Sequence, residues 1–126
     1  MVMAKKIALV GHCGPDSSFL RMAIGQAAKG ASIVNADDES ELEQMVSGGG
    51  VDLVLFNRVL DFGFSTSSGA EVIRKVKAVR PEQRVMMVTN YPDAQAEAVA
   101  NGALPGFGKR EIGTPRVVEL LKSALE

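Results

Sequence analysis

The chain has 126 residues, of which 46% are hydrophobic and 23% charged, so it is long enough for one globular domain with a substantial core. Its 14 basic and 15 acidic side chains give a net charge of -1 and form no basic stripe, which excludes a nucleic-acid surface. The single cysteine, Cys13, excludes an internal disulfide, and the apolar run 7–10 is too short for a signal peptide or a membrane span. We therefore expect one cytoplasmic domain over residues 1–126 that contacts neither nucleic acid nor membrane.

The first predicted strand covers residues 7–10, which are all apolar, as in a strand that is covered on both faces. Pro15 suits the first turn of the following helix, Asp16 favours its positive end, and Gly30 stops it. Apolar residues at helical spacing predict its buried side, which comprises Phe19, Leu20, Ala23, Ile24 and Ala27.

The second strand is predicted at residues 32–36, and a helix follows it. Asp38, with Glu41 three residues later, resembles a capping box at the start of this helix. Its predicted inner face consists of Leu42, Met45 and Val46, and the glycines at 48–50 end it.

The third strand, residues 51–57, is the stretch around which the domain is organised. It is a compact apolar run that begins after a glycine turn and ends at the polar residue Asn57. A long loop over residues 58–69 follows and contains Phe62 and Phe64. The next helix, at about 69–79, carries an apolar face made of Val72, Ile73, Val76 and Val79.

The last part of the chain contains two further strands and two further helices. A strand at 84–89 precedes an Ala-rich helix at 92–101, whose weak apolar face is Ala96, Val99 and Ala100. The strand at 103–107 is short and weakened by Pro105 and Gly106. Thr114 and Pro115 begin the last helix, with an apolar stripe of Val117, Val118, Leu120, Leu121 and Leu125.

Five strands alternate with five helices, which predicts an α/β fold that is doubly wound around a parallel five-stranded sheet. Because ligands gather at the carboxyl ends of parallel strands, polar residues there are candidate site residues. Asn57 ends the third strand, Thr89 ends the fourth, and Lys109 follows the fifth. We expect these side chains to converge, either as an anion pocket beside the N-terminus of the first helix or as a hydrogen-bonded polar cluster.

Taken in order, several segments resemble the receiver domains of two-component response regulators over nearly the whole chain. Residues 6–10 are similar to the family's opening strand, residues 52–55 lead to its phosphoacceptor position at Asn57, and residues 69–73 are similar to the start of its third helix. Thr89 lies at the family's switch position, and Gly102, Ala103 and Lys109 match its closing Gly-Ala and its invariant Lys. The resemblance implies a flavodoxin-like (CheY-like) fold with strand order 2-1-3-4-5.

The chain departs from the family at the residues that carry its chemistry. The family holds Mg²⁺ with an acidic pair and the phosphoacceptor Asp, whereas the pair's positions here are Gly11 and His12 and the acceptor position is Asn57. An amide does not form an acyl phosphate, and these groups are poor Mg²⁺ ligands, so we expect neither a metal nor another cofactor. The aromatic partner of the switch Thr falls on Gly106, and the Pro after the Lys falls on Arg110. We interpret the chain as a degenerate pseudo-receiver.

Three further groups have alternative explanations. His12 and Cys13 are candidate metal or redox ligands, but there is no second ligand pair, so a plain loop explains them better. The acidic residues 37–39 either replace the missing acidic pair or, as we expect, cap the second helix. Phe62 and Phe64 are either a hydrophobic lid on the domain or anchors for a partner.

The resemblance implies a stand-alone signalling module that acts by protein–protein contact without phosphorylation at position 57. Its partner, a histidine kinase or another signalling protein, is expected to bind the face of the 92–101 helix, the 103–107 strand and the last helix. Two alternatives stay open, namely a phosphorelay component that uses His12 or a Ser as acceptor, and a sensor of a small anion or metabolite. No nucleophile–base pair is visible, so we expect no enzyme.

Overall fold

The computed structural model describes residues 5–60 and 63–126. Within these ranges the chain forms five strands, which are β1 (Lys6–Val10), β2 (Ser32–Ala36), β3 (Leu53–Asn57), β4 (Val85–Val88) and β5 (Leu104–Phe107). The same ranges contain the α-helices α1 (Gly14–Ala27), α2 (Glu39–Ser47), α3 (Gly69–Val79), α4 (Pro92–Ala100) and α5 (Pro115–Leu125). A 3-10 turn, η1 (Lys109–Glu111), follows β5 and was not predicted.

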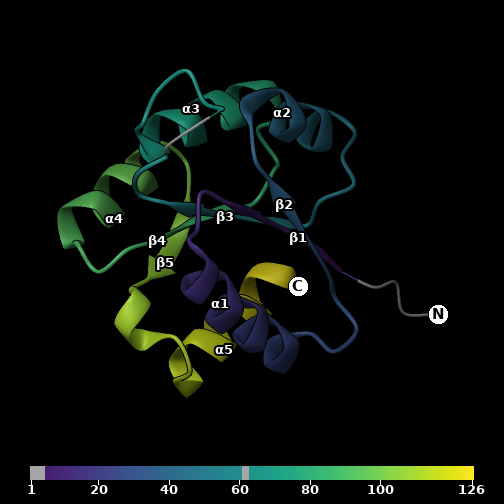
Figure 1. Cartoon of the computed structure of the whole chain (residues 1–126), viewed down its shortest axis with the longest axis vertical. Helices are drawn as coiled ribbons and strands as arrows, with labels where there is room; N and C mark the ends of the chain where they lie inside the picture. The colour runs from purple at the N-terminus through teal and green to yellow at the C-terminus, as the bar shows by residue number, and fades with distance from the viewer. Residues whose placement is uncertain (1–4, 61–62) are drawn as a thin grey trace.

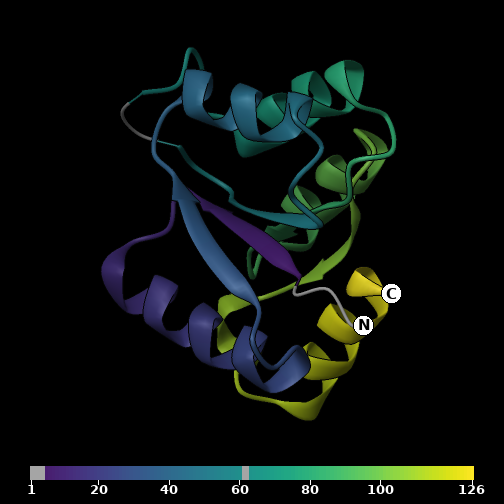
Figure 2. The same ribbon diagram turned by 90° about the vertical axis from the view of Figure 1, so that its right-hand side faces the viewer.

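The sheet is parallel throughout, with strand order β2-β1-β3-β4-β5, so the predicted fold is confirmed. Figure 1 shows α1 and α5 on one side of the sheet and α2, α3 and α4 on the other. The turned view in Figure 2 shows the same two layers. No helix in the described part of the chain is both long and apolar enough to span a membrane.

Two apolar clusters, one on each face of the sheet, form the core. Successive side chains of a strand point to opposite faces, so Leu55 joins the cluster under α1 and α5 while Phe56 joins the cluster under α2 and α3. Both side chains are fully buried, and burial of each contributes roughly 1.5–3 kcal/mol to stability. The core therefore fixes β3 and places Asn57 at the edge of the sheet where the strands end.

The start of α2 shows the predicted capping pattern with one change. The Asp38 carboxylate accepts a hydrogen bond from the Glu41 N–H at 2.7 Å, so Asp38 is the N-cap. The Glu41 carboxylate reaches back to the N–H of Asp37 at 3.1 Å rather than to that of Asp38. The reciprocal bond of a capping box is thus made one residue earlier than the sequence pattern indicates.

Some predicted apolar faces were wrong. Phe19 and Val79 lie at the edges of their helical stripes and are 54% and 52% exposed. On α4 the predicted face of Ala96, Val99 and Ala100 is exposed, whereas Ala98 is buried. Because alanine occupies every second position from 94 to 100 in α4, hydrophobic periodicity could not tell which side of the helix faces the protein.

Candidate functional site

Asn57, Thr89 and Lys109 lie together where the strands end. Asn57 is the last residue of β3, Thr89 follows β4, and Lys109 follows β5. All three line one open pocket of about 390 Å³, here called the strand-end pocket, together with Arg58, Val59, Asn90 and Tyr91. Parallel strands bring these positions to one edge of the sheet, as the sequence indicated.

The polar groups of Asn57 and Thr89 form hydrogen bonds with backbone groups two residues further along the chain. The Asn57 side-chain amide donates to the carbonyl of Val59 at 3.0 Å and so holds the start of the β3–α3 loop. Thr89 is buried, and its hydroxyl oxygen accepts a hydrogen bond from the N–H of Tyr91 at 3.3 Å. Both side chains therefore organise the loops that leave their own strands.

Lys109 forms an ion pair with a carboxylate that sequence reasoning did not select. Its Nζ lies 3.0 Å from Oδ2 of Asp16 in the first turn of α1, and both side chains are partly exposed. The hydrogen bond from Lys109, with a smaller one from Cys13, holds the pKa of the Asp16 carboxyl below its ordinary value. The sequence signal was Asp16 itself, an acid at the start of the first helix. The sequence pattern assigned it only to the helix dipole.

Gly11 has a backbone conformation and a neighbour that together exclude a larger residue. Its φ is +78°, a left-handed value that glycine adopts at little cost. A Cβ at this position would lie 2.4 Å from Cδ2 of Leu60, which is fully buried. The β3–α3 loop holds Leu60 there through its N–H bond to the Ser67 carbonyl at 2.8 Å and the antiparallel bridge between Val59 and Ser68. At this position, therefore, an acidic side chain is absent, and Leu60 occupies the place that a Cβ would take.

His12 turns its ring toward the sheet. Nε2 lies 2.9 Å from the carbonyl oxygen of Leu55, and Nδ1 is buried without a hydrogen-bond partner among the described residues. Burial lowers the pKa of His12, the Leu55 bond opposes this, and the charge of Lys109 lowers the pKa further. The ring is thus held neutral, and Nε2 donates to a backbone carbonyl rather than facing the pocket.

The other candidate ligands do not gather into a metal site. Cys13 is exposed and occupies the N-cap of α1 without a side-chain cap bond. Asp38 caps α2, and Glu39 accepts from the Ser65 hydroxyl at 2.9 Å and lies 3.7 Å from Nζ of Lys75. Across residues 5–60 and 63–126 no three His, Cys, Asp or Glu side chains are placed to hold a metal ion together.

The two loop phenylalanines differ in what the structure describes. Phe64 is half-buried and packs against the core cluster that lies under α2 and α3. Phe62 lies outside the described residues.

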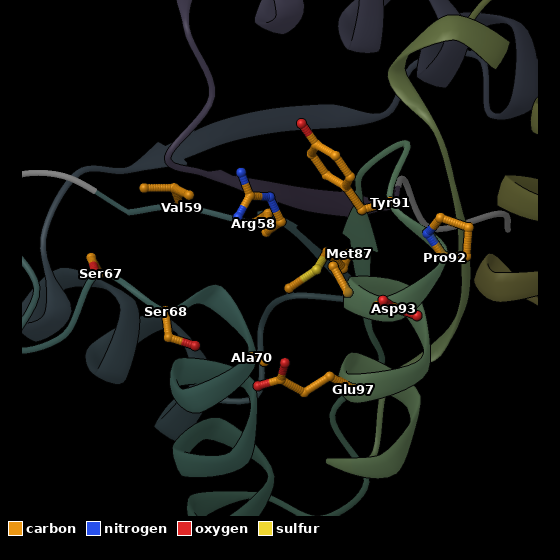
Figure 3. A pocket seen from close by; sticks show the side chains of 11 residues that line it. Arg58, Val59, Ser67, Ser68, Ala70, Met87, Tyr91, Pro92, Asp93 and Glu97 are labelled. Carbon is orange, nitrogen blue, oxygen red and sulfur yellow. The ribbon is translucent and has the colours of Figure 1, made fainter.

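Arg58 and Tyr91 separate the strand-end pocket from a wider one. The guanidinium carbon of Arg58 lies 4.7 Å from the ring centroid of Tyr91, a cation–π contact at the surface. Figure 3 shows the wider pocket, of about 680 Å³, with Arg58 and Tyr91 on one side and Glu97 of α4 on the other. Met87 and Ala70 supply buried apolar surface to this pocket.

Gln95 of α4 is a second residue that sequence reasoning missed. Its side chain fills the space beside Gly106, where a Cβ would come within 3.1 Å of the carboxamide and 2.1 Å of the Met87 carbonyl oxygen. Its Nε2 donates to the Met87 carbonyl at 2.7 Å, and its Oε1 accepts from the Gly106 N–H at 3.2 Å. A polar residue within the predicted Ala-rich helix was the only signal that could have found it.

The predicted partner face, formed by α4, β5 and α5, contains a shallow groove. Its volume is about 670 Å³, and its apolar lining includes Ala96, Val99 and Pro105. These residues are exposed, and the ion pair of Arg116 with Glu111 lies at the α5 side of the groove.

No protein-family model matches the sequence, and no curated protein matches it either. Several solved structures have the same fold. The chain is 16% identical to a protein from Chloroflexus aurantiacus described as a response regulator, with a TM-score of 0.80 and coverage of 98% of both chains. It is 19% identical to the signal receiver domain of an HD domain-containing protein from Pseudomonas fluorescens, with a TM-score of 0.76 over 99% of this chain and 89% of that one.

A third neighbour is longer. The chain is 19% identical to NtrX from Brucella abortus, with a TM-score of 0.74, and the match covers 98% of this chain but 27% of NtrX. At these identities the comparisons establish the receiver-domain fold, and the activity has to be argued from the residues of the site.

Proposed function

We propose that this chain is a cytoplasmic, receiver-like module of two-component signalling that acts by binding another protein and is not phosphorylated at position 57. The observation that carries the proposal is the composition of the strand-end site. Asn57 presents an amide, Leu60 occupies the place that a Cβ would take at Gly11, and His12 bonds to the sheet. Two carboxylates of the described residues lie near these groups: Asp16 is paired with Lys109, and Asp37 lines a hollow together with Gly11 and His12.

These groups do not suit phosphoryl transfer. An acyl phosphate forms on a carboxylate, and Mg²⁺ prefers several hard oxygen ligands in near-octahedral geometry. Asn57 supplies a carbonyl oxygen at most, and its amide N–H is already bonded to Val59. We therefore propose that the site binds no Mg²⁺ and that Lys109 finds its permanent counter-charge in Asp16.

The phosphorelay alternative, with His12 as acceptor, has little geometric support. A phosphoryl acceptor needs a ring nitrogen that an incoming phosphate can reach. In His12, Nε2 is bonded to the Leu55 carbonyl and Nδ1 is buried.

The anion-sensor alternative is favoured by one observation, namely that Arg58 and Lys109 line the same strand-end pocket. Against it, Lys109 is neutralised by Asp16 and Arg58 is stacked on Tyr91. An anion would have to displace both contacts.

The proposed partner surface is the α4–β5–α5 face. Aromatic and apolar side chains that are exposed on a folded protein are common anchors for partners, and this face exposes Ala96, Val99 and Pro105 beside Tyr91. A histidine kinase or another signalling protein is the class of partner that the receiver fold suggests.

The test is an amide NMR titration with Mg²⁺ and beryllofluoride, a mimic of the phosphoryl group, and with inorganic phosphate alone. We expect no shifts at Asn57, Thr89 or Lys109 in the natural chain. Asn57→Asp is expected to stay silent as well, because Leu60 still fills the space beside Gly11.

The outcomes of this titration distinguish the proposed function from the anion-sensor alternative. Shifts at these residues with beryllofluoride in the natural chain contradict the proposal, and shifts with phosphate alone that Lys109→Ala abolishes favour the anion sensor. Recovery of binding in Asn57→Asp alone would place the whole defect at the acceptor and show that the space beside Gly11 does not matter.

A further inference from the structure

The pairing of β4 with β5 is irregular. Met86 pairs with Leu104, but Val88 pairs with Phe107, so β5 contains an extra residue over this interval. Pro105 lies within the interval and has no N–H to donate. The backbone groups at this point need hydrogen-bond partners from outside the ladder.

The side chain of Gln95 supplies those partners from α4. Its Nε2 donates to the carbonyl of Met87 on β4 at 2.7 Å and lies 3.3 Å from the carbonyl of Phe107 on β5 and 3.5 Å from that of Thr89. The Phe107 carbonyl also accepts the Thr89 N–H at 2.9 Å. Its Oε1 accepts the N–H of Gly106 at 3.2 Å. One carboxamide thus bridges both strands, and the missing side chain of Gly106 is what lets it approach so closely.

Little else holds α4 in place. Ala98 is its only buried residue, Ala94 packs partly buried against the core, and the side chains of Ala96, Val99 and Ala100 face outward. Tyr91 at the N-cap makes no side-chain cap bond. A short helix with one buried methyl group gains little from packing, so polar contacts decide where it lies.

We propose that Gln95 is a positioning residue that fixes α4 on the edge of the sheet, so that the α4–β5–α5 face keeps one conformation whatever occurs in the strand-end pocket. The inference rests on the proposed function only in treating this face as the partner surface. It implies a partner that binds the module constitutively, because a face fixed in this way is ready to bind without a signal.

Hydrogen exchange on the full chain tests the proposal. Gln95→Ala is expected to speed exchange of the α4 and β5 amides by about 10- to 100-fold relative to those of α1 and α2, because the bonds of Gln95 to buried backbone groups are lost together. The matched control is Gln83→Ala. Gln83 is a buried glutamine whose Nε2 donates to the Val51 carbonyl at 3.1 Å, away from α4. This control is expected to lower protection without singling out α4.

A second variant keeps the test valid if Gln95→Ala folds poorly. Gln95→Glu retains the shape of the side chain, but its ionised form can donate to neither the Met87 nor the Phe107 carbonyl. Those carbonyls raise the pKa of the introduced carboxyl. Protection of α4 is therefore expected to be near that of the natural chain at low pH and to fall as pH rises through this pKa, whereas the natural chain shows no such step.

Two results would overturn the inference. One is α4 protection in Gln95→Ala that changes only in step with the rest of the chain. The other is α4 protection in Gln95→Glu that is independent of pH. Either result leaves the proposed function intact if the beryllofluoride titration of the natural chain is silent, whereas α4 shifts in that titration would contradict both.

Discussion

At the scale of single residues, the most consequential feature of the strand-end site is the side chain of Leu60 beside Gly11. Leu60 is fully buried over Gly11, and the loop hydrogen bond to Ser67 holds it there. A fully buried leucine at this position should behave like any other core leucine. It should therefore contribute to stability rather than to ligand binding.

We predict that Leu60→Ala lowers the free energy of unfolding by about 2–5 kcal/mol, as for other buried leucines that leave a cavity. Urea denaturation measures the change. The neighbouring Val59, 38% exposed, provides the control, since Val59→Ala should change stability by roughly 0.5 kcal/mol or less. Equal effects of the two substitutions would show that Leu60 is not a core residue.

His12 makes the stability of the domain depend on pH. Its pKa in the folded chain is lowered, mainly by burial, so the unfolded chain binds a proton first as the pH falls. We predict that stability is constant above the ordinary histidine pKa of about 6.5 and declines as the pH drops below it, until the folded-state pKa is reached. The sign is the same for Asp16, whose lowered pKa adds a further loss at more acidic pH.

NMR titration of the ring protons measures the His12 pKa without ambiguity, because the chain contains one histidine. Lys109→Met should raise this pKa slightly, because the lysine charge is a lesser cause of the shift than burial. Titration of His12 at or above its ordinary value would contradict the buried placement of the ring.

At the scale of helices and strands, local sequence signals worked where the chemistry is local. Gly69 and the proline that follows the helix indicate the bounds of α3, and a short apolar run indicates those of β2. The structure has both elements at the expected residues. The orientation of α4 depends instead on Gln95, and the path of the β3–α3 loop depends on Leu60. The partners of both side chains lie on other elements. Periodicity carries no information about such contacts, so this part of the site could not be predicted.

Two helix starts offer a direct comparison of capping. Asp38 accepts a bond from the Glu41 N–H at 2.7 Å, whereas Thr114 caps α5 without any side-chain bond. We predict that Asp38→Ala costs about 1 kcal/mol of stability and that Thr114→Ala costs a few tenths at most. Thermal and urea unfolding of both variants check this. A loss at Thr114 as large as that at Asp38 would mean that α5 is capped in solution by a bond absent from this structure.

At the scale of the whole molecule, Asp16 and Gln95 anchor the strand-end pocket and the partner face through different contacts, although Thr89 and Asn90 line both the pocket and the groove of the partner face. Asp16 of α1 holds Lys109, and Gln95 of α4 holds the edge formed by β4 and β5. The two sets of contacts share no hydrogen-bond partner. A domain that transmits a signal needs an element whose two arrangements both sites influence, and these contacts hold each site separately.

We therefore predict that Lys109→Ala and Gln95→Ala act additively. In a double-mutant cycle, the loss of unfolding free energy in the double variant should equal the sum of the single losses within about 0.5 kcal/mol, because the two residues stabilise different elements. Urea denaturation of the natural chain and the three variants supplies the four values. An interaction energy above about 1 kcal/mol would show that the pocket and the face are energetically coupled. In that case the module could still switch, and the fixed-face inference would have to give way to one in which Lys109 and Gln95 act as a single unit.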